Sequence, residues 1–120
     1  MPSKSPDSLL PLRPVVFEIL LILNEGERHG YGLMQDVKAR TDGRWDLGPG
    51  TLYRTLRELQ ELDLIRPSAR REAPDADNER RRYYELTPFG RRVATAEATR
   101  MAALVKVARS GNLLSRAKRP

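Results

Sequence analysis

The sequence predicts a mainly α-helical protein with a small β-hairpin, closed by one long helix. Three observations predict this fold class. Apolar residues recur with helical spacing in three short segments within residues 13–62. Two segments that can form strands, 64–68 and 80–86, flank a polar stretch. A threonine and a proline then mark the start of a helix that continues to about residue 110.

Composition narrows the class of protein. The chain has 120 residues, which is enough for one domain with a short extension. Its formal net charge of +6 favours a polyanionic partner, either nucleic acid or an anionic membrane surface. The most apolar run, residues 15–23, is too short to cross a bilayer, and the N-terminal segment has no secretory signal. We therefore expect a cytoplasmic protein without a membrane span.

The residues that catalysis and metal binding need are scarce. The sequence has no cysteine, which excludes a disulfide framework, a thiolate metal site and a cysteine nucleophile. The single histidine, His29, cannot supply a histidine metal cluster, and we interpret it as a polar residue before the second helix. No glycine-rich phosphate loop follows a strand, and no carboxylates are paired at a plausible site. We expect no enzyme activity, no metal and no cofactor.

The first third of the chain predicts an arm and two helices. Residues 1–11 are rich in proline and serine with nothing to pack, so we expect a flexible arm. Residues 13–24 predict a mostly buried helix, with Pro14 in its first turn. Residues 30–40 predict a second helix. The inner stripe of this second helix is expected to comprise Tyr31, Met34 and Val37.

The stretch GPGTLYRTLRELQELDLI, residues 48–65, predicts a third helix with a sharp start. Gly48 is the cap residue, and Pro49 occupies the first helical position. One side of this helix is an apolar stripe of Leu52, Leu56, Leu59 and Leu62. The other side presents, near the N-terminus, Thr51, Arg54 and Arg57, with Tyr53 at the border. Positive side chains gather where the helix dipole is also positive, so this end is suited to meet an anion.

Three helices followed by a hairpin is the element order of a winged helix-turn-helix domain. In that fold the second and third helices form the helix-turn-helix, and the third enters the DNA major groove. The last helix begins at Thr87-Pro88 and ends at Gly111-Asn112. The predicted boundaries are an arm at 1–11, a DNA-binding domain at 12–86, a dimerisation helix at 87–111 and a basic tail at 112–120.

Three segments together resemble the PadR-like family of transcriptional regulators: HGYGLMQDV, GPGTLYRTLRELQELDLI and RRRYYELTPFG. The resemblance covers residues 15–109, and the combination is specific where each motif alone is weak. It implies a homodimer, usually a repressor, that binds a pseudo-palindromic operator in double-stranded DNA. It also implies a hairpin on the DNA backbone or minor groove, a C-terminal helix that pairs with a second subunit, and release by a small-molecule effector. The short final segment resembles the subgroup with a single C-terminal helix.

Seven residues are candidate DNA contacts. The planar fork of arginine matches the major-groove acceptors of guanine or a phosphate, and threonine and tyrosine hydroxyls can bond phosphate oxygens. In a strand, Arg80 and Arg82 share one face and Arg81 takes the other. The alternative at both places is an ordinary solvated surface. The candidates are Thr51, Tyr53, Arg54, Arg57, Arg80, Arg81 and Arg82.

The last helix carries a narrow apolar seam with heptad-type spacing, which suits a partner helix. Packing on its own domain is the alternative, but three helices already close a winged-helix core, so the seam would stay exposed without a partner. The expected dimer interface comprises Ala94, Ala98, Met101, Leu104, Val105 and Ala108. Trp45 is interpreted as a core anchor between the helix-turn-helix and the hairpin, with a ligand pocket as the alternative.

Two other functions stay open. One is a winged-helix protein-interaction module that never touches DNA, against which the outward arginines argue. The other is a ligand sensor whose DNA contact is secondary. Specific duplex binding tests the first, and a thermal-shift screen with phenolic and cationic compounds tests the second.

Overall fold

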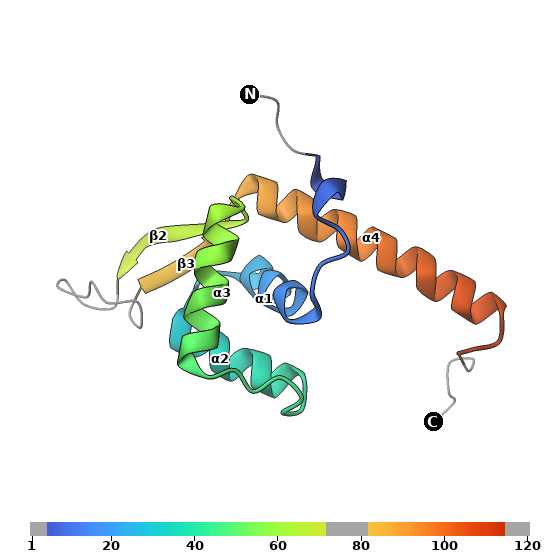
Figure 1. The fold of residues 1–120 in the computed structure, drawn as a ribbon, viewed down its shortest axis with the longest axis horizontal. Helices are drawn as coiled ribbons and strands as arrows, with labels where there is room; N and C mark the ends of the chain where they lie inside the picture. The colour runs from blue at the N-terminus through green and yellow to red at the C-terminus, as the bar shows by residue number, and fades with distance from the viewer. Residues whose placement is uncertain (1–4, 72–81, 115–120) are drawn as a thin grey trace.

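A computed structural model describes residues 5–71 and 82–114 of the chain. Three helices pack together with a small sheet at one side, and a long fourth helix leaves the domain (Figure 1). In chain order the elements are η1 (Pro6–Leu9), α1 (Pro14–Glu25), β1 (Arg28–His29), α2 (Gly30–Arg40), α3 (Pro49–Glu61), β2 (Ile65–Arg71), β3 (Arg82–Leu86) and α4 (Pro88–Ser110). This confirms the mainly helical fold class with a hairpin that the sequence predicts.

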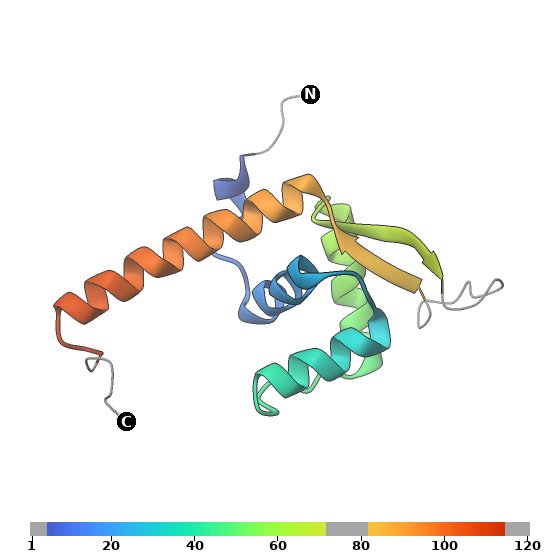
Figure 2. The ribbon, with the colours of Figure 1, turned by 180° about the vertical axis from the view of Figure 1, so that it is seen from behind.

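The core is built around α1, which lies in the middle of the domain (Figure 2). Pro14 occupies its first position, and the helix buries Val16, Ile19, Leu20, Ile22 and Leu23. The leucine stripe of α3 packs on this core through Leu52, Leu56 and Leu59, whereas Leu62 ends the helix and stays partly exposed. The expected stripe of α2 is wrong at Tyr31, which is exposed, and right at Val37, which is buried together with Gly30 and Leu33.

The sheet has three strands, in the spatial order β1-β3-β2. The hairpin of β2 and β3 is antiparallel, with an irregular register between Pro67 and Arg71. The two-residue strand β1 adds to the other edge of β3, where Arg28 lies opposite Tyr84 and His29 opposite Tyr83. The sequence did not predict β1, because two residues are too few to show the alternation typical of a strand.

The N-terminal segment packs against α4 in the part that the structure describes. The 3-10 helix η1 contacts α4, and Leu9, Leu10 and Leu12 lie against the core. For residues 5–11, the described part of the arm expected at 1–11, this packing differs from the flexibility that the sequence predicts. The leucines of this segment pack on an apolar surface of the folded domain, which the sequence alone does not reveal.

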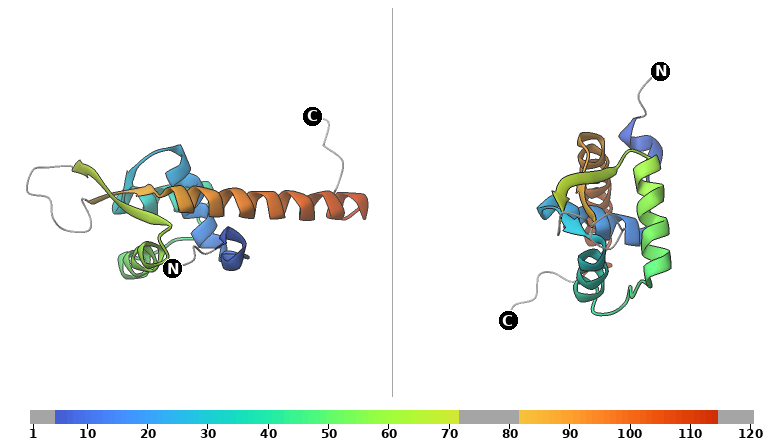
Figure 3. Two further views of the ribbon diagram at one scale, coloured as in Figure 1. Left: turned by 90° about the horizontal axis from the view of Figure 1, so that it is seen from above. Right: turned by 90° about the vertical axis from the view of Figure 1, so that its left-hand side faces the viewer.

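The long helix α4 has two different halves. Thr87 caps its start by accepting a hydrogen bond from the Gly90 N–H at 2.8 Å, as its sequence predicts. Residues 88–100, the proximal half, bury Val93 and Glu97 in the domain. Residues 101–110, the distal half, extend away from the other elements (Figure 3). Across residues 5–71 and 82–114, the structure contains no helix of the length and apolar character that a membrane span requires.

Candidate nucleic-acid interface

The first two turns of α3 present three polar side chains to solvent. Thr51, Arg54 and Arg57 are exposed, whereas the leucines on the opposite side of the same turns are buried. Arg54 lies close to Thr51, with 3.4 Å between its Nη2 atom and the Thr51 hydroxyl oxygen. We call these three residues the front face of α3. The burial of one side and exposure of the other agree with the amphipathic pattern of the sequence.

The N-terminus of α3 adds positive potential to the front face. Gly48 caps the helix without a side-chain oxygen, so no side chain at the cap position covers the first backbone N–H groups. The first turn, which is described in full, contains no acidic residue. A Cβ atom on Gly48 or Gly50 would meet no described atom within 4 Å. An anion can therefore approach the backbone as well as the side chains.

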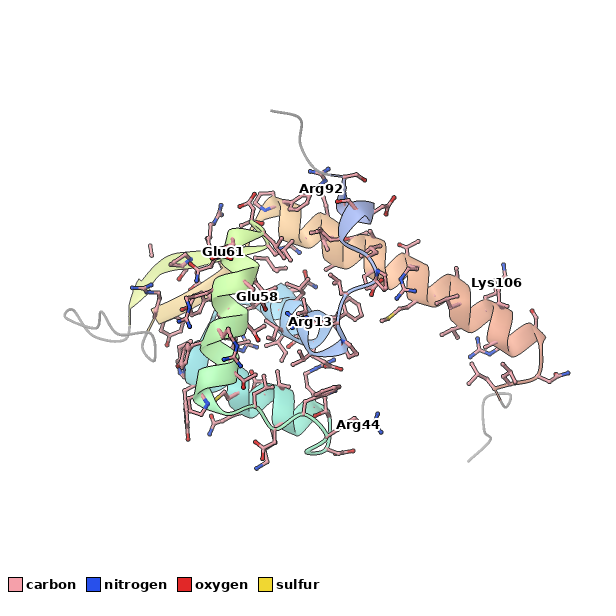
Figure 4. All side chains as sticks on the ribbon, in the orientation of Figure 1. Arg13, Arg44, Glu58, Glu61, Arg92 and Lys106 are labelled. Atoms are coloured by element: carbon pink, nitrogen blue, oxygen red, sulfur yellow. The ribbon has the colours of Figure 1, made fainter. Side chains whose placement is uncertain are left out.

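Acidic residues occupy the later turns of the same helix. Glu58 forms an ion pair with Arg13 at 2.8 Å, and Glu61 is exposed one turn further on (Figure 4). The charge of α3 therefore changes sign along its length. A polyanion is therefore attracted more strongly to the N-terminal turns than to the C-terminal end of the helix.

Tyr53 differs from its expected place at the border of the front face. It is 8% exposed, and its ring packs on Gly30 of α2. A Cβ atom at Gly30 would lie 2.5 Å from Cε1 of Tyr53, so the glycine is what allows this contact. The buried phenol is held inside the domain, and the expectation that it bonds a phosphate is corrected to a packing role.

The wing is described only in part. Arg80 and Arg81 lie outside the described residues, so their expected contacts remain predictions. Arg82 begins β3 and is half-buried, opposite Arg71 of β2. Further along the hairpin, Arg66 is paired with Glu85 across the strands at 2.7 Å. Arg82 is thus the only one of the three candidate arginines that the described structure places on the sheet.

Tyr31 is a surface residue, although the helical spacing of the sequence predicts it on the inner side of α2. It lies in the first turn of α2, is 54% exposed, and shares a hollow of about 160 Å³ with Met34, Pro49 and Tyr53. Gly30, Leu33 and Val37 also follow a helical spacing. This second stripe shares Val37 with the expected one, and it was the available signal that Gly30 and Leu33 face the core.

The expected dimer seam is exposed on the distal half of α4. Val93, Glu97, Met101, Leu104 and Ala108 are spaced four, four, three and four residues apart, so the buried face of the proximal half continues onto the distal half. There Leu104 is 54% and Val105 42% exposed, and Val107, which the sequence analysis did not include, is 70% exposed. Ala98 is exposed, but Ala94 packs against the domain's own core, which corrects its assignment to the seam.

A buried carboxylate lies where α4 meets the N-terminal segment. Glu97 is fully buried and accepts hydrogen bonds from the Leu12 N–H at 2.9 Å and from Arg100 at 2.6 and 3.1 Å. The hydrogen bonds from Arg100 lower the pKa of Glu97, and the Leu12 bond adds to this, against the opposing effect of burial. Glu97 is therefore a structural anion, paired on two sides.

His29 has a structural role at the start of α2. The Nδ1 atom of His29 accepts the Gly32 N–H at 2.9 Å, which caps α2 and confirms a polar residue at its start. Among the described residues, no three His, Asp or Glu side chains lie close enough to hold a metal ion.

Trp45 packs on the core from the loop after α2, beside the ion pair of Glu18 and Arg40. It lies at the opposite end of α2 from the sheet, which corrects its expected place beside the hairpin.

The arrangement of α1, α2, α3 and the three-stranded sheet defines a winged helix-turn-helix domain, in which α2 and α3 are the helix-turn-helix pair. The sequence profile of the Transcriptional regulator PadR-like family matches residues 19–96. The chain belongs to this family, whose members are transcriptional regulators and in general not enzymes.

Solved structures share the fold of this chain, and one protein of known sequence resembles part of it. A transcriptional regulator from Clostridium thermocellum is 25% identical, with a TM-score of 0.64 over 90% of this chain and 97% of that one. A PadR family regulator from Clostridium difficile R20291 is 23% identical, with a TM-score of 0.64 over 80% of this chain and 95% of that one. A 37.1 kDa protein in transposon Tn4556 of Streptomyces fradiae is 35% identical over 72% of this chain. The chain spans only 22% of that relative's length.

Proposed function

We propose that the protein is a homodimeric transcriptional repressor that binds a pseudo-palindromic operator in double-stranded DNA. One observation carries the proposal: the front face of α3 exposes Thr51, Arg54 and Arg57 on a helix whose other side is anchored in the core. A rigid helix with two arginines at its positive end fits the major groove, where arginine bonds guanine or phosphate. Arg80, Arg81 and Arg82 would add contacts from the wing to the DNA backbone.

The distal half of α4 supports the dimer. Met101, Leu104, Val105 and Ala108 form an apolar surface on a helix that leaves its own domain. A second copy is the simplest occupant, because two-fold pairing of the same helix covers the same surface on both subunits. The two copies of α3 would then read half-sites about 34 Å apart, one turn of DNA.

Release by a small-molecule effector is the third part of the proposal. It follows from the family, and the adaptable side chain of Met101 in the seam is suited to contact such a molecule. Phenolic and cationic compounds are the classes to screen by thermal shift. A compound that raises the melting temperature and lowers operator affinity supports this part, and a screen without such a compound counts against it.

The central experiment measures DNA binding directly. Fluorescence anisotropy compares a labelled duplex from the protein's own promoter with an unrelated duplex of equal length, at moderate salt. We expect tighter binding to the promoter, with two subunits per operator in sedimentation of the complex. Equal affinity for both duplexes, or none for either, would contradict the proposal and favour a protein-interaction module.

A further inference from the structure

Tyr31 is the exposed tyrosine of this protein. The chain has four tyrosines, all within the described residues, and Tyr53, Tyr83 and Tyr84 are at most 8% exposed. Tyr31 is 54% exposed in the first turn of α2. A tyrosine combines a large apolar ring with a polar hydroxyl. It is therefore enriched at interfaces, where the ring packs on apolar groups and the hydroxyl forms a hydrogen bond. The exposed ring and hydroxyl of Tyr31 are therefore available to a partner.

The neighbours of Tyr31 place it beside the N-terminus of α3, the helix proposed to enter the DNA groove. It shares its hollow with Pro49, the first residue of α3, and with Met34 and Tyr53. Two residues before it, His29 pairs with Tyr83 of β3, the residue after Arg82. The phenol therefore lies next to the N-terminus of α3, and the chain just before Tyr31 pairs with β3.

The charge around Tyr31 is compatible with a polyanion. The first turns of α2 and α3, both described in full, contain no acidic residue, and both helices present their positive dipole ends here. Asp36, one turn further along α2, is neutralised by an ion pair with Arg28 at 3.1 Å. No carboxylate of these first turns would repel a phosphate at this point.

We propose that Tyr31 contacts the sugar–phosphate backbone of the bound duplex, an inference that rests on the proposed function. Its hydroxyl donates a hydrogen bond to a phosphate oxygen, and its ring packs against a deoxyribose at the mouth of the hollow. In a helix-turn-helix the first helix crosses the DNA backbone while the second enters the groove. Tyr31 is thus a positioning residue: it sets the register of α3 and reads no base.

The first test compares Tyr31→Phe and Tyr31→Ala with the wild-type protein. Tyr31→Phe removes only the hydroxyl and should weaken binding about 10-fold or more, as expected for one hydrogen bond to a charged phosphate oxygen. The loss should be equal for operator and unrelated duplex, because a backbone contact carries no sequence information. The salt dependence should keep its slope, since a neutral phenol releases no counterion. Tyr31→Ala should weaken binding further while the melting temperature stays near wild type.

The second test follows the accessibility of the phenol itself. Nitration with tetranitromethane, mapped by mass spectrometry, should modify Tyr31 in the DNA-free protein and spare it in the complex. The buried tyrosines serve as the internal control, because they should resist nitration in both states. Protection of Tyr31 without DNA would instead place it in a protein interface and overturn the inference.

The outcomes separate this inference from the proposed function. If the wild-type protein binds its operator but Tyr31→Phe binds equally well, or Tyr31 is nitrated in the complex, the Tyr31 contact is overturned alone. If the wild-type protein binds no duplex, both fail together. If Tyr31→Phe weakens binding to the operator but not to the unrelated duplex, Tyr31 reads sequence and the positioning role is overturned.

Discussion

The backbone N–H of Leu12 donates a 2.9 Å hydrogen bond to the carboxylate of Glu97, in the middle of α4. The next residue, Arg13, forms an ion pair with Glu58 of α3 at 2.8 Å. Two consecutive residues of the N-terminal segment therefore connect the helix proposed to form the dimer with the helix proposed to bind DNA. The Glu97 contact is buried, whereas the Arg13 pair is exposed and contributes little to stability.

Removal of the Glu97 carboxylate should destabilise the fold. Glu97→Ala deprives the Leu12 N–H and Arg100 of their acceptor, so we expect the free energy of unfolding to fall by about 1.5–3 kcal/mol. Urea denaturation measures the change. The matched control is Glu61→Ala, which removes an exposed glutamate and should change stability by less than about 0.5 kcal/mol. Equal effects of the two substitutions would mean that Glu97 does not anchor the N-terminal segment.

The same carboxylate predicts a pH dependence. Arg100 holds the pKa of Glu97 below its usual 4.5, so the folded state prefers the charged form. The stability that this preference contributes is fully present above pH 4.5 and is lost as the pH falls through the lowered pKa. The difference in unfolding free energy between wild type and Glu97→Gln should therefore shrink on acidification. A difference that stays constant down to about pH 3 would refute the assignment.

Arg57→Ala should weaken operator binding without unfolding the protein. The side chain is exposed on the front face of α3, and loss of a cation that neutralises a phosphate should reduce the slope of log affinity against log salt by about 1. Anisotropy titrations at several salt concentrations measure both quantities. Arg92→Ala serves as the control, since Arg92 lies at the start of α4, away from the front face (Figure 4). Unchanged affinity of Arg57→Ala would remove this residue from the interface.

Met101→Glu combined with Val105→Glu should produce monomers. Two carboxylates in the apolar seam would have to be buried against a second copy, at a cost that exceeds the gain from pairing. Sedimentation velocity measures the state. Lys106→Glu changes charge in the same turns of α4 but on another side of the helix, and should remain dimeric. A dimeric double variant would show that the seam is elsewhere.

Gly90→Ala should destabilise the junction of α4 with the domain. A Cβ atom there would collide with the backbone oxygen of Leu64, which cannot move without shifting the turn before β2. We expect a loss of at least about 2 kcal/mol in thermal or urea unfolding. Gly50→Ala is the contrasting control, because its Cβ would meet no described atom within 4 Å and alanine favours the helix by about 1 kcal/mol.

The sequence by itself determined where the main helices begin and which side of α3 faces water. Gly48-Pro49 and Thr87-Pro88 start α3 and α4 as their residues indicate. Caps and prolines act within one turn of the chain, so their effect can be read without knowing the fold. The front face was also predicted from the sequence, because α3 has a single leucine stripe and Thr51, Arg54 and Arg57 lie on the side opposite to it.

Only the tertiary structure decided which tyrosine is buried and what the N-terminal segment does. Tyr31 and Tyr53 exchange their expected places because Gly30 leaves room for the ring of Tyr53, and this contact joins two different helices. The strand β1 exists because β3 offers it a free edge, and residues 6–12 pack because Glu97 and the core receive them. Each of these choices depends on a partner distant in sequence, which local periodicity does not encode.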